Sequence, residues 1–148
     1  MSITLRPAES SDQERVAELL AALGAAADLR PLPDNFADTF SDLLDQARGR
    51  VIVADEGGVL LGMASVSYNV AMRYGGEYCQ LEELIVDPQA RGKNVGGLLV
   101  QQTIDDAKSR GCAEYGLYLV EHTEHNRPFY EKYGFEAVGT EMRMALNN

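Results

Sequence analysis

The chain has 148 residues, 45% of them hydrophobic and 24% charged, a composition typical of one globular domain with a buried core. Its formal net charge of -10 argues against non-specific nucleic-acid binding, because attraction to phosphate needs a basic face. The first residues lack the basic and apolar regions of a signal peptide, and every apolar run is shorter than the roughly 18 residues of a membrane span. We therefore expect a single cytoplasmic domain over residues 1–148 that binds neither nucleic acid nor membrane.

Cysteine and histidine show no pattern typical of metal or redox chemistry. Cys79 and Cys112 lack CxxC spacing, so they are expected to be buried or half-buried thiols. His122 and His125 are not accompanied by cysteines or carboxylates at ligand spacing, and surface or local hydrogen-bonding roles are expected for them. The sequence thus predicts no metal cofactor.

The amino-terminal residues have the pattern of a strand followed by a helix. Residues 3–8 are expected to form the strand. Ser11 and Glu14 have the spacing of a capping box, which predicts that a helix begins there, and Gly24 offers a place for that helix to end.

The middle of the chain predicts a second helix and three strands. Proline in residues 29–35 breaks the chain before a segment, 36–47, in which apolar residues repeat at helical spacing. Residues 50–70 contain two β-rich runs around the glycine pair of "DEGG", the pattern of an antiparallel hairpin. Residues 78–86 are expected to form the next strand, which ends before Pro88.

The last third predicts two helices and two strands. Helices are expected over 95–110 and 126–133, and strands over 114–120 and 135–146. This order of elements indicates an α/β domain with a mixed sheet.

A turn with two cations and several glycines joins the strand 78–86 to the helix 95–110. Helix N-terminal amides, glycines that let a ligand approach the backbone, and the side chains of Arg91 and Lys93 together predict an anion site. The turn is not a P-loop, because Gly92-Lys93 lacks the earlier glycine and the following Ser or Thr, and no GxGxxG fingerprint is present.

The turn resembles the signature of the GNAT superfamily of N-acetyltransferases. It reads Val86-Asp87-Pro88, then Arg91-Gly92-Lys93-Asn94-Val95-Gly96, then Leu98-Leu99. The sequence departs from the family pattern at Asn94, where the family usually has glycine. Asparagine is the non-glycine residue that best tolerates the left-handed backbone conformation. A second landmark of the family is present as Phe129-Tyr130-Glu131-Lys132-Tyr133-Gly134-Phe135.

The resemblance implies a single GNAT-like domain and an acyltransferase that uses acetyl-CoA as co-substrate. The implied fold is α/β, with a mixed, mostly antiparallel sheet of six to seven strands flanked by four helices. Backbone amides of the turn would hold the pyrophosphate, and backbone groups at the end of the preceding strand would pair with the pantetheine arm. The residues assigned to acetyl-CoA are Leu84, Ile85, Val86, Arg91, Gly92, Lys93, Asn94, Val95, Gly96, Gly97 and Asn126.

Asn126 is the least direct of these assignments. The family often has an asparagine seven residues before the tyrosine of its second landmark, and here that position is Thr123. Asn126 is also the expected N-cap of the helix that Pro128 begins.

Acetyl transfer requires a base for the amine and an acid for the departing thiolate. Tyr130 stands where the family places the acid. Glu82 and Glu83 are candidate bases, but neighbouring strand residues face opposite sides of a sheet unless a bulge intervenes. Their string also resembles the spermidine/spermine-type branch, in which the first acidic residue lies close to the amine, so we favour Glu82; the alternative is that both are solvated and a water chain removes the proton.

Aromatic and acidic residues between 67 and 78 suggest a wall for a cationic acceptor, since aromatic faces and carboxylates both attract ammonium groups. The residues expected to form it are Tyr68, Tyr74, Glu77 and Tyr78. The expected function is transfer of acetyl from acetyl-CoA to a primary amine, of a small molecule or peptide, by direct attack. The alternative is a non-catalytic CoA-binding or regulatory module, and a homodimer is possible in either case.

Overall fold

The computed structural model of the chain describes residues 2–27 and 32–146, so part of the expected break at 29–35 lies outside the described residues. The chain divides into two compact units, Met1–Leu117 and Tyr118–Asn148. The expectation of one domain over residues 1–148 stays a prediction.

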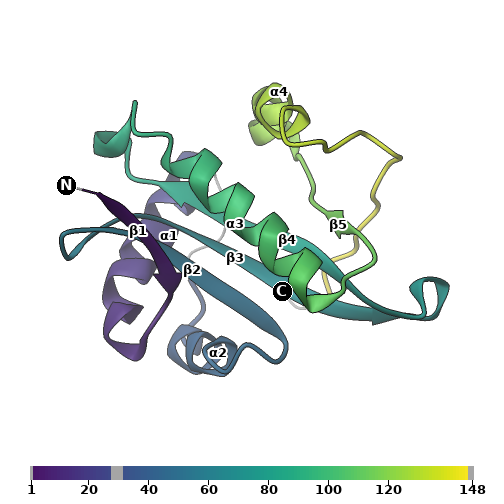
Figure 1. The fold of residues 1–148 in the computed structure, drawn as a ribbon, viewed down its shortest axis with the longest axis horizontal. Helices are drawn as coiled ribbons and strands as arrows, with labels where there is room; N and C mark the ends of the chain where they lie inside the picture. Colours follow the sequence, from purple (N-terminus) through teal and green to yellow (C-terminus); the bar gives the residue numbers. More distant parts are fainter. Residues whose placement is uncertain (1, 28–31, 147–148) are drawn as a thin grey trace. The chain divides into compact units, whose positions relative to one another are not determined.

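The N-terminal unit is built on a five-stranded sheet with the order β1-β2-β3-β4-β5 (Figure 1). Strands β1 to β4 are antiparallel neighbours, and β5 is parallel to β4. This confirms a mixed, mostly antiparallel sheet. The strands are β1 (Ile3–Pro7), β2 (Gly49–Glu56), β3 (Val59–Ala71), β4 (Gly76–Val86) and β5 (Tyr115–Gly116).

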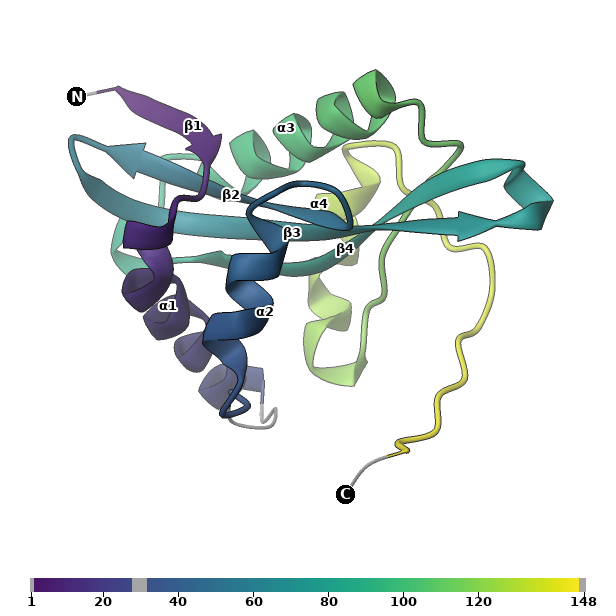
Figure 2. The same ribbon diagram turned by 90° about the horizontal axis from the view of Figure 1, so that it is seen from below.

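Four helices are found in the described residues, as expected. They are α1 (Gln13–Ala27), α2 (Phe36–Leu43), α3 (Val95–Arg110) and α4 (Arg127–Glu131). Within the N-terminal unit, α1 and α2 cover one face of the sheet and α3 covers the other (Figure 2). Short 3-10 turns join the longer elements: η1 (Ser10–Asp12), η2 (Met72–Tyr74), η3 (Pro88–Ala90) and η4 (Glu121–Asn126).

Alternate strand residues bury on opposite faces of this sheet, as the period of two requires. Val51, Val53 and Met63 pack into a core cluster with residues of α1 and α2, including Val16 and Phe40. On the other face the sheet approaches α3 so closely that a side chain would not fit at every position. A Cβ atom on Gly62 would lie 2.7 Å from the Ile85 carbonyl oxygen and 3.1 Å from Val95 Cγ1, so glycine there lets the start of α3 pack on the strand.

Helix boundaries differ from expectation where tertiary contacts outweigh local signals. The span 95–110 is confirmed for α3, which ends at Gly111 in the left-handed conformation (φ 87°). Helix α1 continues past Gly24 to Ala27, since one glycine inside a helix costs only about 1 kcal/mol. Helix α2 ends at Leu43, earlier than expected, and the chain then turns through Gln46 with a φ of 65°.

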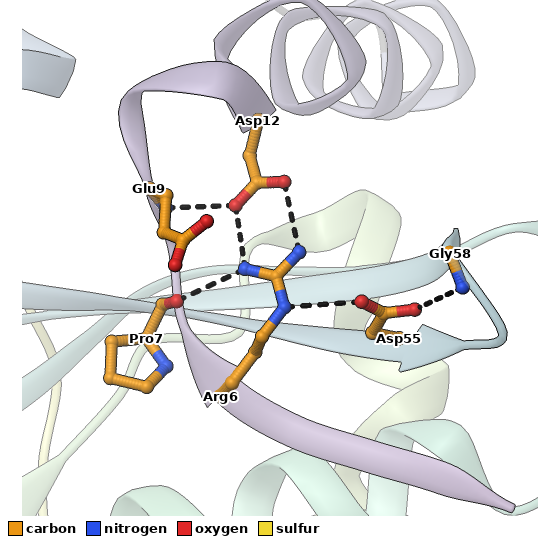
Figure 3. A network of polar contacts seen from close by, with 6 residues as sticks. All are labelled: Arg6, Pro7, Glu9, Asp12, Asp55 and Gly58. Carbon is orange, nitrogen blue, oxygen red and sulfur yellow. Dashed lines mark hydrogen bonds and ion pairs between the residues drawn. The ribbon is translucent and has the colours of Figure 1, made fainter.

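The start of α1 is organised by a different residue pair from the one expected. The Glu9 amide donates to the Asp12 carboxylate at 2.8 Å, and the Asp12 amide donates to the Glu9 carbonyl at 2.9 Å. The capping box assigned to Ser11 and Glu14 is therefore wrong. The Asp12 carboxylate is in turn held by Arg6 of β1, and this contact fixes where the chain leaves the strand (Figure 3).

The strand expected over 135–146 is absent and the one expected over 114–120 is shortened, so the sheet has five strands rather than six or seven. The strand expected over 114–120 is reduced to β5, which pairs with β4 through Cys79 and Gln80. The segment 135–146 has no regular secondary structure. Its alternating pattern needs a neighbouring strand to pair with, and the described residues of the C-terminal unit contain helical turns and no strand. Four of its large apolar side chains are exposed: Val138, Met142, Met144 and Leu146.

Candidate active site

The turn between β4 and α3 is tied to its surroundings at Asp87. Its amide donates to the Leu61 carbonyl at 2.8 Å, which continues the β3–β4 pairing past the strand end. One carboxylate oxygen accepts from the Gln89 amide at 2.9 Å, and the other accepts from Arg15 Nη2 of α1 at 2.7 Å. These hydrogen bonds hold the pKa of the Asp87 carboxyl below its usual range. The turn thus begins at a fixed point against both the sheet and α1.

The turn then reverses through two residues with positive φ. Gly92 has a φ of 85°, and Asn94 adopts the left-handed conformation with φ 57° and ψ 32°. Asn94 thus adopts the left-handed conformation that asparagine was expected to tolerate.

The first amides of α3 have no partner within the helix. The earliest helical bond runs from the Leu98 amide to the Asn94 carbonyl at 3.0 Å, so the amides of Val95, Gly96 and Gly97 precede the intrahelical ladder. The Asn94 side chain makes no capping hydrogen bond to them. Together with the positive end of the helix dipole, these donors suit a pyrophosphate.

The two cations of the turn differ in their contacts. Arg91 is exposed. Lys93 is also exposed, but its Nζ lies 2.7 Å from Glu56 Oε1 at the end of β2. One of the two charges assigned to the anion site is therefore paired within the protein.

Among the strands that the structure describes, none but β3 pairs with the end of β4. Leu84, Ile85 and Val86 pair with β3 on one side, opposite residues 62–64. The pairing with β5 in the described residues involves only Cys79 and Gln80, so it does not reach this end of β4. Pairing of backbone groups on this side with an extended pantetheine arm stays a prediction.

A β-bulge brings Glu82 and Glu83 to the same face of the sheet. The register passes from Ser65 opposite Glu83 to Val66 opposite Leu81, which leaves Glu82 as the extra residue of β4. Both carboxylates accept from serines of β3 that lie two residues apart and therefore share a face. Ser67 Oγ donates to Glu82 Oε2 at 2.6 Å, and Ser65 Oγ donates to Glu83 Oε1.

These two carboxylates differ in exposure, and neither has a cationic partner among the described residues. Glu82 is exposed, whereas Glu83 is half-buried. Burial raises the pKa of Glu83, the Ser65 hydrogen bond opposes that shift, and the Glu82 charge adds to it. Neither takes part in any of the ion pairs found in residues 2–27 and 32–146.

Tyr130 and Asn126 lie in the C-terminal unit. Asn126 is the N-cap of α4, as expected, and its side chain makes no capping hydrogen bond. The Tyr130 ring packs edge-on against Phe129, with ring centroids 5.0 Å apart, and against Phe135 at 6.0 Å. Tyr130 is buried, which raises the pKa of its hydroxyl and keeps it protonated near neutral pH.

Two of the residues expected to form an acceptor wall lie away from the face of the sheet that carries Glu82 and Glu83. Tyr68 and Glu77 are both contacted by Arg110 at the end of α3, on the opposite face of the sheet. The Arg110 guanidinium lies 3.8 Å from the centroid of the Tyr68 ring and donates to both Glu77 oxygens, at 2.8 and 3.0 Å. Tyr74 and Tyr78 pack on each other beside the β3–β4 turn, with ring centroids 5.3 Å apart. Their role as a wall stays a prediction.

Sequence reasoning missed the uncharged partners on β3, which are Ser65, Ser67 and Asn69. Their spacing was the available signal, because three polar residues alternate there within an otherwise apolar strand and must share one face. It also missed Arg15, whose contact with Asp87 joins residues far apart in the chain and leaves no local pattern.

Comparison with known proteins identifies the family of the chain. A family model described as acetyltransferase (GNAT) family matches residues 14–135. A glucosamine 6-phosphate N-acetyltransferase of Trypanosoma brucei brucei is 30% identical, over 99% of this chain and 97% of the relative. A probable glucosamine 6-phosphate N-acetyltransferase 2 of Oryza sativa subsp. japonica is 30% identical, over 95% of this chain and 86% of the relative.

Solved structures show the same fold. A transcriptional regulator from Bacillus halodurans C-125 superimposes with a TM-score of 0.86 at 29% identity, covering 98% of this chain and 100% of the other. A predicted acetyltransferase with acetyl-CoA from Clostridium acetobutylicum superimposes with a TM-score of 0.82 at 17% identity, covering 98% and 97%, and supports the fold alone.

The fold and the family match define an acyltransferase. The chain belongs to the GNAT acetyltransferase family and is an acetyl-CoA-dependent N-acetyltransferase. None of its described helices is both long and apolar enough to cross a membrane.

Proposed function

We propose that the enzyme transfers the acetyl group of acetyl-CoA directly to a primary amine, without a covalent enzyme intermediate. The observation that carries this is the juxtaposition of uncapped amides at the start of α3 with the end of β4, which pairs with β3 alone among the described strands, on a chain of the GNAT family. Amides from Arg91 to Gly97 would bind the pyrophosphate, and residues 84–86 would pair with pantetheine. Asn126 is retained as a cofactor contact from the C-terminal unit.

The reaction requires two proton transfers. The amine enters as an ammonium group and must lose a proton before its nitrogen attacks the thioester carbonyl carbon. A carbon–nitrogen bond then forms, the carbon–sulfur bond breaks, and the departing thiolate takes a proton. We assign the second proton to the Tyr130 hydroxyl, which burial keeps protonated.

We assign Glu83 as the base that removes the first proton, from the ammonium group. This replaces Glu82, which the sequence alone favoured and which lies beside it. A carboxylate with a raised pKa is a better base near neutral pH, and Glu83 is the half-buried member of the pair. Glu82 contributes its negative charge, which acts on Glu83 and attracts an ammonium group.

The first acceptor to test is glucosamine 6-phosphate. Two relatives with this substrate in their names match the chain along nearly its whole length. It is a small polar primary amine, consistent with the hydroxyl and amide groups that Ser65, Ser67 and Asn69 place beside the acidic pair. We also propose that the enzyme works in the cytoplasm and as a homodimer, and gel filtration with light scattering tests the dimer.

Thiol release from acetyl-CoA, measured over a panel of amines, tests the proposed function. The panel contains glucosamine 6-phosphate, spermidine, a free amino acid and a peptide with a free N-terminus. We expect the sugar phosphate to give the highest kcat/KM. A higher value for any other amine would overturn the proposed acceptor, and the ranking would identify the class that replaces it.

The matched variants for the acid are Tyr130→Phe and Tyr133→Phe. Both tyrosines pack against Phe129, with ring centroids 5.0 and 5.4 Å away, so each variant removes one hydroxyl from the same aromatic cluster. We expect Tyr130→Phe to lower kcat by about 100-fold and Tyr133→Phe to leave it within a few-fold. Equal effects of the two variants would contradict the assignment of Tyr130.

A further inference from the structure

We propose that Ser65 and Ser67 of β3 are positioning residues, whose hydroxyls hold the Glu83 and Glu82 carboxylates in place for proton removal from the acceptor. The inference rests on the proposed function, because it assumes that this carboxylate pair acts as the base. It adds two residues outside the family's motifs and assigns each of them to one member of the pair.

The β-bulge creates the need for such partners. It turns two neighbouring carboxylates to one face of the sheet, where their like charges repel. Without further contacts, two flexible side chains under repulsion would spread over several rotamers. Ser65 and Ser67 supply one hydroxyl to each carboxylate, so the two glutamates are held by separate donors on the neighbouring strand.

The direction of the Ser67 hydrogen bond follows from its second partner. Asn69 Nδ2 lies 3.0 Å from Ser67 Oγ and can only donate to it. The Ser67 hydroxyl proton is therefore directed at Glu82 Oε2, 2.6 Å away. Asn69 thus donates to Ser67, and Ser67 donates to the Glu82 carboxylate.

Ser65 is placed differently, because it is buried with 3% of its surface exposed. A buried hydroxyl needs a hydrogen-bond partner, and Glu83 is the acceptor that the structure provides. Since an ionised carboxylate can only accept, the bond requires the Ser65 hydroxyl to donate and favours the charged form of Glu83, which is the form a base must have.

The surroundings leave this role to the serines. The charged group that acts on Glu83 is Glu82, and the β3 residues facing the pair are uncharged. From α1, which packs on the same face, Val16 and Leu19 are buried apolar residues. Arg15 of that helix is engaged by Asp87. No described cation competes with the hydroxyls for the two carboxylates.

The test is the pH profile of kcat/KM for acetyl-CoA-dependent thiol release, because its acidic limb reports ionisation of the base. Loss of a donor to the ionised pair makes the pair harder to deprotonate, so the limb moves to higher pH. A hydrogen bond to a charged group is worth about 1.5–3 kcal/mol, so we expect Ser65→Ala to move the limb upward by about one pH unit. Ser67→Ala should move it in the same direction by less, because Glu82 is exposed.

Two further variants separate positioning from a general loss of structure. Ser67→Thr keeps a hydroxyl on the strand and should restore the wild-type profile. Thr103→Val removes another buried hydroxyl, which is 1% exposed and donates to the Val100 carbonyl at 2.7 Å on the α3 face. It should lower the thermal unfolding midpoint without moving the limb.

The outcomes distinguish this inference from the function on which it rests. If Glu83→Gln removes the acidic limb while neither serine-to-alanine variant moves it, the positioning role is overturned and the base assignment stands. If Glu83→Gln keeps both the rate and the limb, the base assignment fails and the positioning role fails with it. A shift in Thr103→Val equal to that in Ser65→Ala would also overturn the proposal.

Discussion

Two acidic clusters of the N-terminal unit differ in what their carboxylates bind. At the start of α1, the Arg6 guanidinium donates to both Asp12 oxygens at 2.8 and 3.0 Å, and to Asp55 of β2 at 3.1 Å (Figure 3). At the bulge of β4, Glu82 and Glu83 accept hydrogen bonds from serine hydroxyls of β3. One cluster contains its own cation, whereas the other has none among the described residues.

Because of this difference, the pKa values of Asp12 and Glu83 are shifted in opposite directions. The hydrogen bond from Arg6 lowers the pKa of Asp12, whereas burial raises the pKa of Glu83. A carboxylate paired with a guanidinium stabilises the fold and gains little by binding anything else. A carboxylate held by hydroxyls stays oriented, keeps its charge uncompensated, and can take a proton from a ligand.

The largest effect that the comparison predicts is the loss of activity in Glu83→Gln. The amide keeps the size of the side chain and can still accept from Ser65, but it cannot take a proton. We expect kcat to fall by about 100-fold or more. The free energy of unfolding at neutral pH should be unchanged or higher, because the variant no longer places a charge at a half-buried position.

Glu82→Gln is the matched control for this prediction, since the two residues are adjacent and both bind a serine. It should lower kcat by less than Glu83→Gln does. A larger loss in Glu82→Gln would return the base to Glu82, the residue that the sequence alone favoured.

The second prediction concerns stability at the other cluster. Arg6→Met removes the cation while Asp12 stays buried and Asp55 stays nearby, so two carboxylates lose their shared donor. We expect the free energy of unfolding to fall by about 2 kcal/mol, measured by urea denaturation with an unchanged m-value. The kcat for acetyl transfer, measured well below the unfolding midpoint, should stay at the wild-type value. A parallel loss of kcat would show that this cluster is not purely structural.

The sequence predicted the parts of the site that depend on local signals. The turn from β4 to α3 is such a part, because its proline fixes its own φ angle, whereas Gly92 and Asn94 are residue types that tolerate a positive φ. The left-handed conformation of Asn94 could therefore be anticipated from the residue type, and it is present. The span of α3 was equally accessible, since helical periodicity and Gly111 both act within a few residues.

Features that depend on strand pairing were not predictable in the same way. Strand alternation places Glu82 and Glu83 on opposite faces, and only the register between β3 and β4 reveals the bulge that unites them. The segment 135–146 shows the converse. It has a strand-like pattern, but a pattern cannot supply the neighbour that a strand requires, and Val138 and Met142 remain exposed.

The third prediction is that acidification changes the stability contributed by the two clusters in opposite directions. The Asp12 carboxyl has a lowered pKa in the folded state, so its stabilisation is present above the unfolded value of about 4 and is lost as the pH falls below it. For Glu83 the folded pKa is raised, so stability increases as the pH falls from that folded pKa toward the unfolded value of about 4.3.

Urea denaturation as a function of pH, with Asp12→Asn and Glu83→Gln, measures these contributions. Asp12→Asn should flatten the loss of stability below about pH 4, relative to the wild type. Glu83→Gln should remove a gain of stability on moderate acidification. Curves with the same slope change in both variants would contradict the contrast between a cation-paired and a hydroxyl-held carboxylate.

The smallest effect concerns a third carboxylate, that of Glu56, which has a cationic partner that is itself exposed. Glu56 pairs with Lys93 at 2.7 Å, and 44% of the lysine side-chain surface is exposed, so the pair contributes at most about 1 kcal/mol to stability. Lys93 nevertheless belongs to the turn proposed to bind the pyrophosphate, where Glu56 competes with the cofactor for the lysine charge.

Glu56→Gln should lower the KM for acetyl-CoA by about two- to three-fold at low ionic strength, and the difference should shrink as salt is added. Glu18→Gln serves as the control, because Glu18 contacts Arg15 at 3.8 Å and lies outside the turn. An unchanged KM in Glu56→Gln would mean that Lys93 does not exchange its internal partner for the cofactor, and the turn would then bind the pyrophosphate through its amides and Arg91.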